Sequence, residues 1–319
     1  MRPEAAAAVT EGMARWANPS SPHAEGRAAR RALEDARARI AKALGWDGDV
    51  ILTSGASEAL AIALGGRDAV ATSVEHDAVL RVAGRQRLAV SADGLVDVSG
   101  VPDRRVAVQS ANSETGVLQP LDGVAARAGV LVADCSQSAG KLPLPPADLI
   151  VVSAHKLGGP PGIGALLVRD FALLTPTGGQ EQGYRGGTEN LPGALGFAAA
   201  LEAPREWFDR AAMLRRELDE VVRGNGGAII ADTSPRIATI AAYRMPGRSA
   251  AAQLMRFDSA GFAVSAGSAC SSGTLKTSHV LTAMGIDAKA ASEVIRVSFG
   301  WTTTAADVER FAAAWKAMA

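Results

Sequence analysis

The chain has 319 residues, and its 33 basic and 33 acidic side chains give a net charge of zero. This balance offers no electrostatic reason to expect a nucleic acid or a membrane surface as a partner. No uninterrupted apolar segment approaches the roughly 20 residues that cross a bilayer, and the N-terminus shows no signal pattern, so we expect a cytoplasmic protein. Two cysteines, Cys135 and Cys270, are too few for a disulfide scaffold.

The first half of the chain alternates predicted helices with short buried strands. Residues 1–17 are alanine-rich and helical in character, and a loop at 18–23 precedes an amphipathic helix over 26–44 that Gly45 ends. A further helix is predicted at 59–64. Strands are predicted at 50–53, 69–72, 87–90, 106–109, 130–133, 149–152 and 165–168. This alternation favours an α/β fold with a mostly parallel sheet and helices on both faces.

Composition changes after a glycine-rich loop at 178–193. A smaller α+β domain is predicted from helices at 204–223 and 249–258 and from strands at 228–231, 237–243, 262–265 and 294–299. The last helix starts near Thr304, which can form a capping box with Asp307. We expect a large domain over residues 15–205 and a small C-terminal domain over residues 206–319, with residues 1–14 packing near the small one.

One predicted buried strand is followed directly by a lysine and a glycine-rich loop. The apolar run 149–152 is followed by Ser153, His155 and Lys156, and a second apolar run follows at 165–168. A lysine between apolar strands is costly unless its charge is used or removed. Burial lowers the pKa of an amine and makes it a nucleophile toward aldehydes. A lysine that snorkels from a strand end explains this segment equally well when the segment is taken alone.

Polar side chains follow five of the predicted strands. Sites in parallel sheets form beyond the carboxyl ends of the strands, so these side chains are expected to lie together. The turn at 54–58 leads from a strand into a helix and exposes backbone N–H groups that suit a phosphate, although a plain helix cap explains it too. The residues after the other four strands are Glu75 and His76; Asn112; Asp134 and Gln137; and Ser153, His155 and Lys156.

Such a set of groups meets the requirements of pyridoxal phosphate. A lysine forms a Schiff base with its aldehyde, a cup of donors holds its phosphate, and an aspartate keeps its ring nitrogen protonated. Other kinds of site find less support. The chain has no Gly-Lys-Ser/Thr phosphate loop, the glycines at 158–164 lie between strands rather than opening a helix, and the cysteines and histidines show no metal-ligand spacing, so no metal is expected.

Several short stretches, each a weak signal alone, follow one another in a specific order. They are residues 18–27, 53–58, 75–76, 112–116, 134–141, 153–164, 185–190, 265–270 and 295–300. As an ordered set across roughly residues 3 to 315, they resemble the cysteine desulfurases of the NifS/IscS kind, within the class V aminotransferase-like enzymes. The resemblance implies a type I pyridoxal phosphate-dependent transferase fold and an enzyme that converts L-cysteine into L-alanine.

The resemblance also assigns roles to the polar residues. Lys156 would form the Schiff base, Asp134 would pair with the ring nitrogen, His76 would stack on the ring, and Gln137 and Asn112 would bond its phenolic oxygen.

A second group of residues would hold the phosphate and the substrate. Ser57, Ser153 and His155 would bind the phosphate, and Thr188 would reach the phosphate of a neighbouring subunit, which implies a homodimer. Arg296, together with Asn112, would bind the substrate carboxylate.

Cys270 lies in a Gly-Ser-Ala-Cys pattern that matches the family branch whose loop carries the persulfide cysteine. Lys156, once freed by the substrate, would take the Cα proton, and the Cys270 thiolate would attack the substrate sulfur. A sulfur-acceptor protein and a role in iron–sulfur cluster biogenesis follow as expectations, whereas Cys135 is expected to be packing.

Two alternatives remain open at this point. The chain fits another class V pyridoxal phosphate enzyme, such as a selenocysteine lyase or an aminotransferase. It also fits a non-catalytic relative, because the Ala-Thr-Thr-Pro-like segment with which family members usually begin is not found before Met1-Arg-Pro-Glu.

Overall fold

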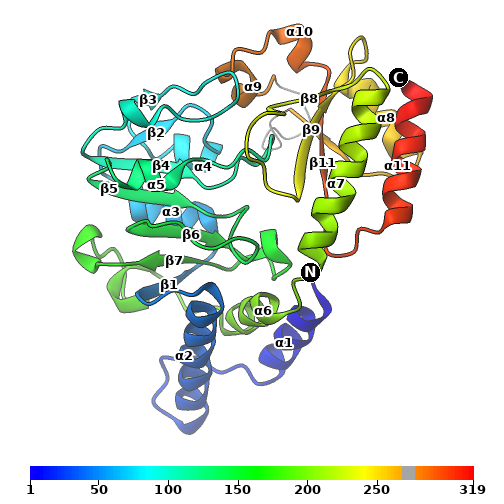
Figure 1. The fold of residues 1–319 in the computed structure, drawn as a ribbon. Helices are drawn as coiled ribbons and strands as arrows, with labels where there is room; N and C mark the ends of the chain where they lie inside the picture. Colours follow the sequence, from blue (N-terminus) through cyan, green and yellow to red (C-terminus); the bar gives the residue numbers. More distant parts are fainter. Residues whose placement is uncertain (268–276) are drawn as a thin grey trace.

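The computed structural model describes residues 1–267 and 277–319 (Figure 1). Its helices are α1 (Pro3–Ala14), α2 (Ala24–Leu44), α3 (Ala56–Leu64), α4 (Asp77–Leu80), α5 (Leu121–Ala125), α6 (Leu191–Glu202), α7 (Trp207–Gly224), α8 (Ala250–Ser259), α9 (His279–Ala283), α10 (Ala288–Ala291) and α11 (Ala305–Met318). Its strands are β1 (Asp49–Thr53), β2 (Val70–Thr72), β3 (Arg87–Leu88), β4 (Arg105–Gln109), β5 (Val130–Asp134), β6 (Leu149–Ser153), β7 (Gly164–Val168), β8 (Ala228–Ile229), β9 (Ile240–Arg244), β10 (Ser265–Ala266) and β11 (Val294–Ser298). Within the ranges described, no helix is both long and apolar enough to span a membrane.

Seven strands form the large sheet in the order β1-β7-β6-β5-β4-β2-β3. Strand β7 runs antiparallel to both of its neighbours, and the pairs from β6 to β3 are parallel. The predicted mostly parallel sheet is therefore confirmed. Because the parallel strands share one direction, their carboxyl ends meet at a single edge of the sheet.

Strand β6 shows why the sequence forms a two-sided sheet. Ile150 and Val152 pack into the core under α2 and α6, while Leu149 and Val151 pack into the core under α3. Successive side chains of a strand point to opposite faces, so a strand covered on both sides needs apolar residues at every position. The apolar run that predicts this strand reflects that double burial.

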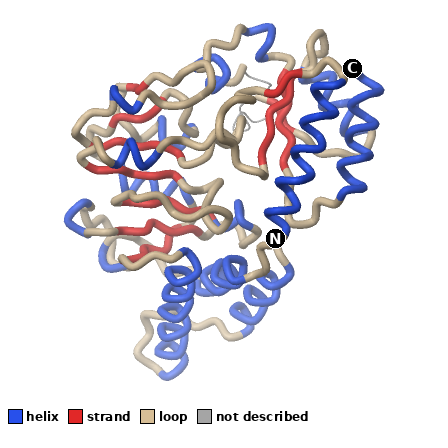
Figure 2. Tube along the Cα trace, in the orientation of Figure 1, coloured by secondary structure: helices blue, strands red, loops and turns tan. Residues whose placement is uncertain are grey.

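A second sheet of four strands forms the smaller lobe, in the order β10-β11-β9-β8. All of its pairs are antiparallel. Figure 1 shows α7 and α11 lying over the outer side of this sheet, and Figure 2 shows the two sheets facing each other across the loops between them. The core of this lobe gathers side chains from β9, β11, α7, α8 and α11, with Trp315 fully buried. Thr304 and Asp307 form the predicted capping box at the start of α11.

The N-terminal helix α1 packs along α6. The two helices approach so closely that a Cβ atom on Gly196 would lie 2.5 Å from Cγ2 of Val9, which explains why a glycine stands there. At the start of the chain, the Arg2 guanidinium lies 5.7 Å from the ring centre of Trp301.

Some predicted elements are shorter than the sequence pattern indicates. The strand predicted at 262–265 is reduced to Ser265–Ala266, because only these two residues pair with β11. Phe262 instead packs edge-on against Phe311, with ring centres 5.3 Å apart. The helix predicted from residue 204 begins at Trp207.

Candidate active site

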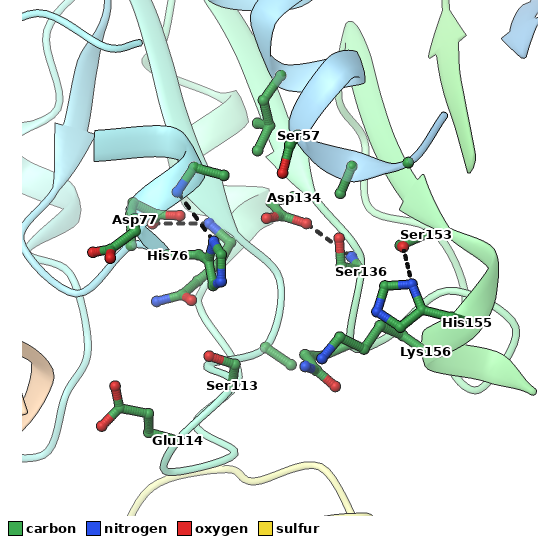
Figure 3. Close-up of a pocket in the computed structure, with 18 of the residues that line it drawn as sticks. Ser57, His76, Asp77, Ser113, Glu114, Asp134, Ser136, Ser153, His155 and Lys156 are labelled. Atoms are coloured by element: carbon green, nitrogen blue, oxygen red, sulfur yellow. Dashed lines mark hydrogen bonds between the residues drawn. The ribbon is translucent and has the colours of Figure 1, made fainter. Parts of the chain in front are cut away.

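A cavity of about 550 Å³ lies where the carboxyl ends of the strands meet the small lobe. The residues that follow β1, β2, β4, β5 and β6 line it from the large sheet, and His279, Val280 and Arg296 line it from the small lobe. Figure 3 shows His155 and Lys156 on one side of the cavity and His76 and Asp77 on the other.

Most of the predicted site residues line this one cavity. They are Ser57, His76, Asp134, Gln137, Ser153, His155, Lys156 and Arg296. Asn112 and Thr188 are not among its lining residues, and Cys270 lies outside the described residues.

Lys156 lies on a short 3-10 turn, Ala154–Leu157, directly after β6. The side chain is exposed to the cavity, whereas the sequence pattern predicts a lysine desolvated between two strands. The difference arises because the turn carries Lys156 beyond the last paired residue of β6, Ser153, which faces Gly164 of β7. Burial between apolar strands therefore does not account for a reactive amine at this position.

His155 and Ser153 form a polar pair beside Lys156. The Ser153 hydroxyl lies 2.9 Å from Nδ1 of His155. Partial burial and the positive charge of Lys156 lower the pKa of His155, which favours the neutral ring at pH 7. A neutral imidazole can donate one hydrogen bond to an anion while accepting another from a hydroxyl group.

Asp134 ends β5 and is held from both sides by neighbouring backbone. It is 9% exposed, it pairs with Val151 of β6, and its Oδ1 accepts a hydrogen bond of 2.9 Å from the backbone N–H of Ser136. The Ser136 hydroxyl is buried and has no hydrogen-bond partner among the described residues. The carboxylate is thus fixed in direction, with one oxygen engaged by the chain.

The start of α3 lies at another end of the cavity. Its N-cap residue, Gly55, carries no capping side chain and has a φ of 149°, a conformation that favours glycine. The first N–H groups of a helix have no intrahelical acceptor and carry a partial positive charge. Together with the exposed Ser57 hydroxyl, they form a site suited to an anion.

Arg296 enters the cavity from β11 of the small lobe. Its Nη1 donates to the carbonyl of Ser113 at 3.0 Å and its Nη2 to the hydroxyl of Ser265 at 3.1 Å. Its Nε atom is buried without a hydrogen-bond partner in the described structure. Burial lowers the pKa of Arg296 and the charge of Glu114 raises it, with a net lowering. The guanidinium therefore retains a donor for a further acceptor.

Asn112 holds its own turn rather than facing the cavity. Its Oδ1 accepts hydrogen bonds from the backbone N–H groups of Glu114 and Thr115, and its Nδ2 donates to the carbonyl of Val74 at 3.1 Å. The side chain is 2% exposed. Its assignment to cofactor and substrate binding remains a prediction.

Some residues that line the cavity or contact its lining are given no role by the sequence analysis. Glu114 accepts a hydrogen bond of 2.5 Å from the Ser278 hydroxyl, and Nε2 of His279 lies 2.9 Å from the carbonyl of Glu75. Ser278 and His279 belong to the small lobe, and the sequence pattern predicts no strand directly before them that could indicate their position. Ser136 could have been found, because it stands between Asp134 and Gln137 in the same turn.

Glu75 is the most deeply buried acid of the cavity wall. Its side chain is fully buried, and its Oε1 accepts hydrogen bonds from the Thr72 hydroxyl at 2.6 Å and from the backbone N–H of Gln109 at 2.9 Å. Burial raises the pKa of Glu75 to about 8, and the charge of Asp134 acts in the same direction. At neutral pH the carboxyl is therefore mainly protonated, which leaves Asp134 without a second negative charge beside it.

Replacing Glu75 with glutamine should change how stability depends on pH. The pKa of Glu75 is about 8 in the folded chain and about 4.3 when unfolded. The folded chain holds the extra proton between these values, so Glu75 stabilises the fold at low pH and loses that contribution as the pH rises toward 8. Relative to wild type, the free energy of unfolding of Glu75→Gln should rise by about 3 kcal/mol between pH 5 and pH 8.

Urea unfolding of the cofactor-free proteins at several pH values measures this difference. The exposed Glu217 of α7 supplies the control, since Glu217→Gln should follow the wild-type pH profile. Parallel profiles for wild type and Glu75→Gln would show that Glu75 titrates normally.

Comparison with known proteins identifies the family to which this fold and cavity belong. The aminotransferase class-V family matches residues 5–311, so the chain belongs to that family. A cysteine desulfurase of Cereibacter sphaeroides is 35% identical over 92% of this chain and 86% of its own length. An IscS-like cysteine desulfurase of Mycobacterium tuberculosis is 36% identical over 97% of this chain and 91% of its own length.

Solved structures agree with this assignment. A NifS-like protein from Rickettsia africae superposes with a TM-score of 0.89 at 27% identity, covering 100% of this chain and 96% of that one. The structure of SspA in complex with cysteine superposes with a TM-score of 0.81 at 27% identity, covering 94% of this chain and 95% of that one. The NifS/IscS resemblance and the fold class predicted from the sequence are confirmed.

Proposed function

We propose that the protein is a pyridoxal phosphate-dependent cysteine desulfurase, which converts L-cysteine into L-alanine and leaves the sulfur as a persulfide on Cys270. The observation that carries the proposal is the convergence of Lys156, Asp134, His76 and the start of α3 on one cavity. An amine, an oriented carboxylate, a ring and an anion site are the groups that this cofactor requires.

The cavity fits the cofactor in two respects that concern its polar atoms. The buried hydroxyl of Ser136 lacks a protein partner in the described chain, and the first turn of α3 has no capping side chain. A buried donor without a protein acceptor is unusual and is expected where a polar ligand binds, and this applies to the Ser136 hydroxyl on the cavity wall. The first N–H groups of α3 add donors that no side chain caps. The phosphate fits at the start of α3, beside Ser57, Ser153 and His155.

The remaining residues would hold the ring. Asp134 would accept a hydrogen bond from the protonated ring nitrogen, His76 would lie against the ring face, and Gln137 would bond the phenolic oxygen. When bound, pyridoxal phosphate supplies a sink for the electron pair released when a bond to the substrate Cα breaks. His76 is oriented for this role by its Nδ1, which accepts a hydrogen bond from the backbone N–H of Ala78 at 3.1 Å.

Arg296 would bind the carboxylate of L-cysteine through its unengaged Nε. The guanidinium is already held by Ser113 and Ser265, so the substrate would be oriented without a further loss of side-chain freedom. The bound cysteine in the SspA structure is consistent with an amino-acid site in this fold.

The proposed reaction transfers one sulfur atom from L-cysteine to the thiol of Cys270, and no external oxidant or reductant is needed. Lys156 would accept the Cα proton at Nζ and return a proton to the carbon skeleton. The Cys270 thiolate would form a bond to the substrate sulfur while the carbon–sulfur bond breaks, with its electron pair remaining on the carbon fragment. L-cysteine and the Cys270 thiol thus become L-alanine and the Cys270 persulfide.

Further proposals concern the partners of the enzyme and the process that it serves. Thr188 is exposed, which leaves it available to a second subunit and is compatible with a homodimer. A sulfur-acceptor protein would remove the persulfide sulfur, with iron–sulfur cluster biogenesis in the cytoplasm as the process it serves.

Incubation with L-cysteine tests the proposed function. We expect L-alanine to form and the peptide that carries Cys270 to gain the mass of one sulfur atom. Cys270→Ala should lose both the added sulfur and sulfide release. Cys135→Ala is the matched control and should keep both, because Cys135 is fully buried and burial raises the pKa of its thiol to about 12.

Two results would count against the proposal. Undiminished turnover in Cys270→Ala would favour another class V enzyme, such as a selenocysteine lyase or an aminotransferase. A purified protein with no visible-range cofactor absorbance and no alanine production would favour a non-catalytic relative.

A further inference from the structure

A carboxylate stands at the start of α3, where the phosphate of the cofactor would bind. Glu58 lies in the first turn of this helix, next to Ser57, and both residues line the cavity. Its Oε2 accepts a hydrogen bond from the backbone N–H of Ser54. Partial burial raises the pKa of Glu58, but the hydrogen bonds from Ser54 and Arg185 and the charge of Arg185 outweigh it. The net effect lowers the pKa, so Glu58 is ionised at neutral pH.

A negative charge at this position opposes the binding of a phosphate. The start of a helix attracts anions because its first N–H groups carry a partial positive charge. A phosphate monoester carries a charge of about −1.5 to −2 at pH 7, and an ionised carboxylate in the same turn repels it. A cation that compensates Glu58 without occupying the space of the phosphate would remove this repulsion.

Arg185 supplies such a cation from the glycine-rich loop. Its Nε donates to both carboxylate oxygens of Glu58, at 3.1 Å to Oε1 and 3.2 Å to Oε2. The Arg185 side chain is 16% exposed and that of Glu58 is 29% exposed, so solvent screens this pair less than a pair on the open surface. Arg185 is not among the described residues that line the cavity. It therefore acts on the anion site through Glu58.

The backbone around Arg185 is held in place. Arg185 and Gln180 exchange two backbone hydrogen bonds, one of 3.1 Å from the Arg185 N–H and one of 2.9 Å from the Gln180 N–H. A Cβ atom on Gly178 would lie 2.2 Å from the Arg185 carbonyl oxygen, which shows how closely the two segments approach. Glu181, in the same turn, accepts the backbone N–H of Leu52 at 2.8 Å. The guanidinium thus comes from a loop that is itself tied to β1.

We propose that Arg185 is a positioning residue for the cofactor phosphate: by pairing with Glu58 it cancels the negative charge at the start of α3, so that the first turn of this helix attracts a phosphate dianion. Glu58 satisfies the Ser54 N–H, and Arg185 removes the repulsion that this carboxylate would otherwise exert. The proposal rests on the proposed function, because it requires the phosphate of pyridoxal phosphate to lie at the start of α3.

Equilibrium dialysis of the cofactor-free protein against pyridoxal phosphate and against pyridoxal tests the proposal without an activity assay. The two compounds share the ring and the aldehyde, so the ratio of their affinities reports on the phosphate site. Arg185→Met and Arg185→Gln should lower the affinity for pyridoxal phosphate by about tenfold and leave the affinity for pyridoxal within about twofold of wild type. An unchanged affinity for pyridoxal also shows that the cavity is folded.

Substitution of the carboxylate separates charge from packing. Arg185→Met combined with Glu58→Gln removes both charges and should restore the wild-type ratio of affinities to within about twofold. Glu58→Gln alone leaves the Arg185 charge uncompensated and should bind pyridoxal phosphate at least as tightly as wild type does. Arg216→Met removes an exposed arginine of α7 and should change neither affinity.

Salt provides a second measurement of the same effect. The deficit of Arg185→Met relative to wild type should shrink as the salt concentration rises, because dissolved ions screen the repulsion. A wild-type ratio of affinities in both Arg185 variants would overturn the proposal, as would a deficit that persists in the double variant. Wild-type protein that binds pyridoxal phosphate no more tightly than pyridoxal would overturn the proposed cofactor site as well.

Discussion

Lys156→Ala should abolish L-alanine formation from L-cysteine, lowering the turnover rate by about 10³-fold or more. The substitution removes the only amine that lines the cavity from the described chain, apart from ring and guanidinium nitrogens. The groups that would hold phosphate and ring nitrogen remain, so cofactor affinity should fall far less than the rate.

Two measurements distinguish this result from a folding defect. Borohydride treatment should tie the cofactor covalently to wild type and to Lys316→Ala but not to Lys156→Ala. Thermal unfolding of cofactor-free Lys156→Ala should match wild type, because Lys156 is exposed and contributes no core packing. Substantial turnover in Lys156→Ala would remove Lys156 from the proposed mechanism.

The large sheet could be predicted from the sequence because its signals are local. A strand buried on both faces needs an unbroken apolar run, and β6 follows the predicted run to within one residue. Gly45 ends α2 in the left-handed conformation, at φ 67°, where glycine is favoured.

The ends of the strands in the small lobe could be predicted less accurately than those of the large sheet. Whether Phe262 belongs to a strand depends on how far β11 extends beside it, and this is decided by pairing across the sheet rather than by residues 262–265. The aromatic side chain is equally suited to the packing against Phe311 that it adopts.

The candidate site, too, could be predicted only where the signals in the sequence are local. Residues that directly follow a parallel strand, such as Asp134 and Lys156, could be placed together because parallel strands end at one edge. Residues that reach the site from the other lobe, or that contact the Lys156 turn from a distant part of the sequence, could not be placed in this way. Lys141 contacts the Lys156 backbone across fifteen positions of sequence, and His279 meets Glu75 across more than two hundred.

Arg37→Met should lower the free energy of unfolding by about 3–5 kcal/mol, because it breaks a buried ion pair and leaves one partner charged. Arg37 of α2 is paired with Glu181 through Nη1–Oε2 and Nη2–Oε1 bonds of 2.6 and 3.0 Å. The Glu181 side chain is 1% exposed, and its Oε2 also accepts the backbone N–H of Leu52 at 2.8 Å. Burial alone would lower the pKa of Arg37, but its hydrogen bonds to Glu181 raise it above its ordinary value.

The same helix supplies a matched control. Arg39 forms a similar two-bond pair with Glu202, but both of those side chains are more than a third exposed. Solvent screens such a pair, so Arg39→Met should cost less than about 1 kcal/mol. Urea unfolding of the two single variants compares the pairs directly, and equal losses would show that burial does not set the strength of the Arg37 pair.

A double substitution shows whether the cost comes from the uncompensated charge. Arg37→Met with Glu181→Met removes both charges and should recover part of the stability lost in Arg37→Met, because no buried carboxylate is left unpaired. Glu181 has a left-handed backbone, at φ 51°, in the loop that leads to Arg185 and Thr188. If the loss persists in the double variant, then Glu181 stabilises this loop through its hydrogen bond to Leu52 rather than through its charge.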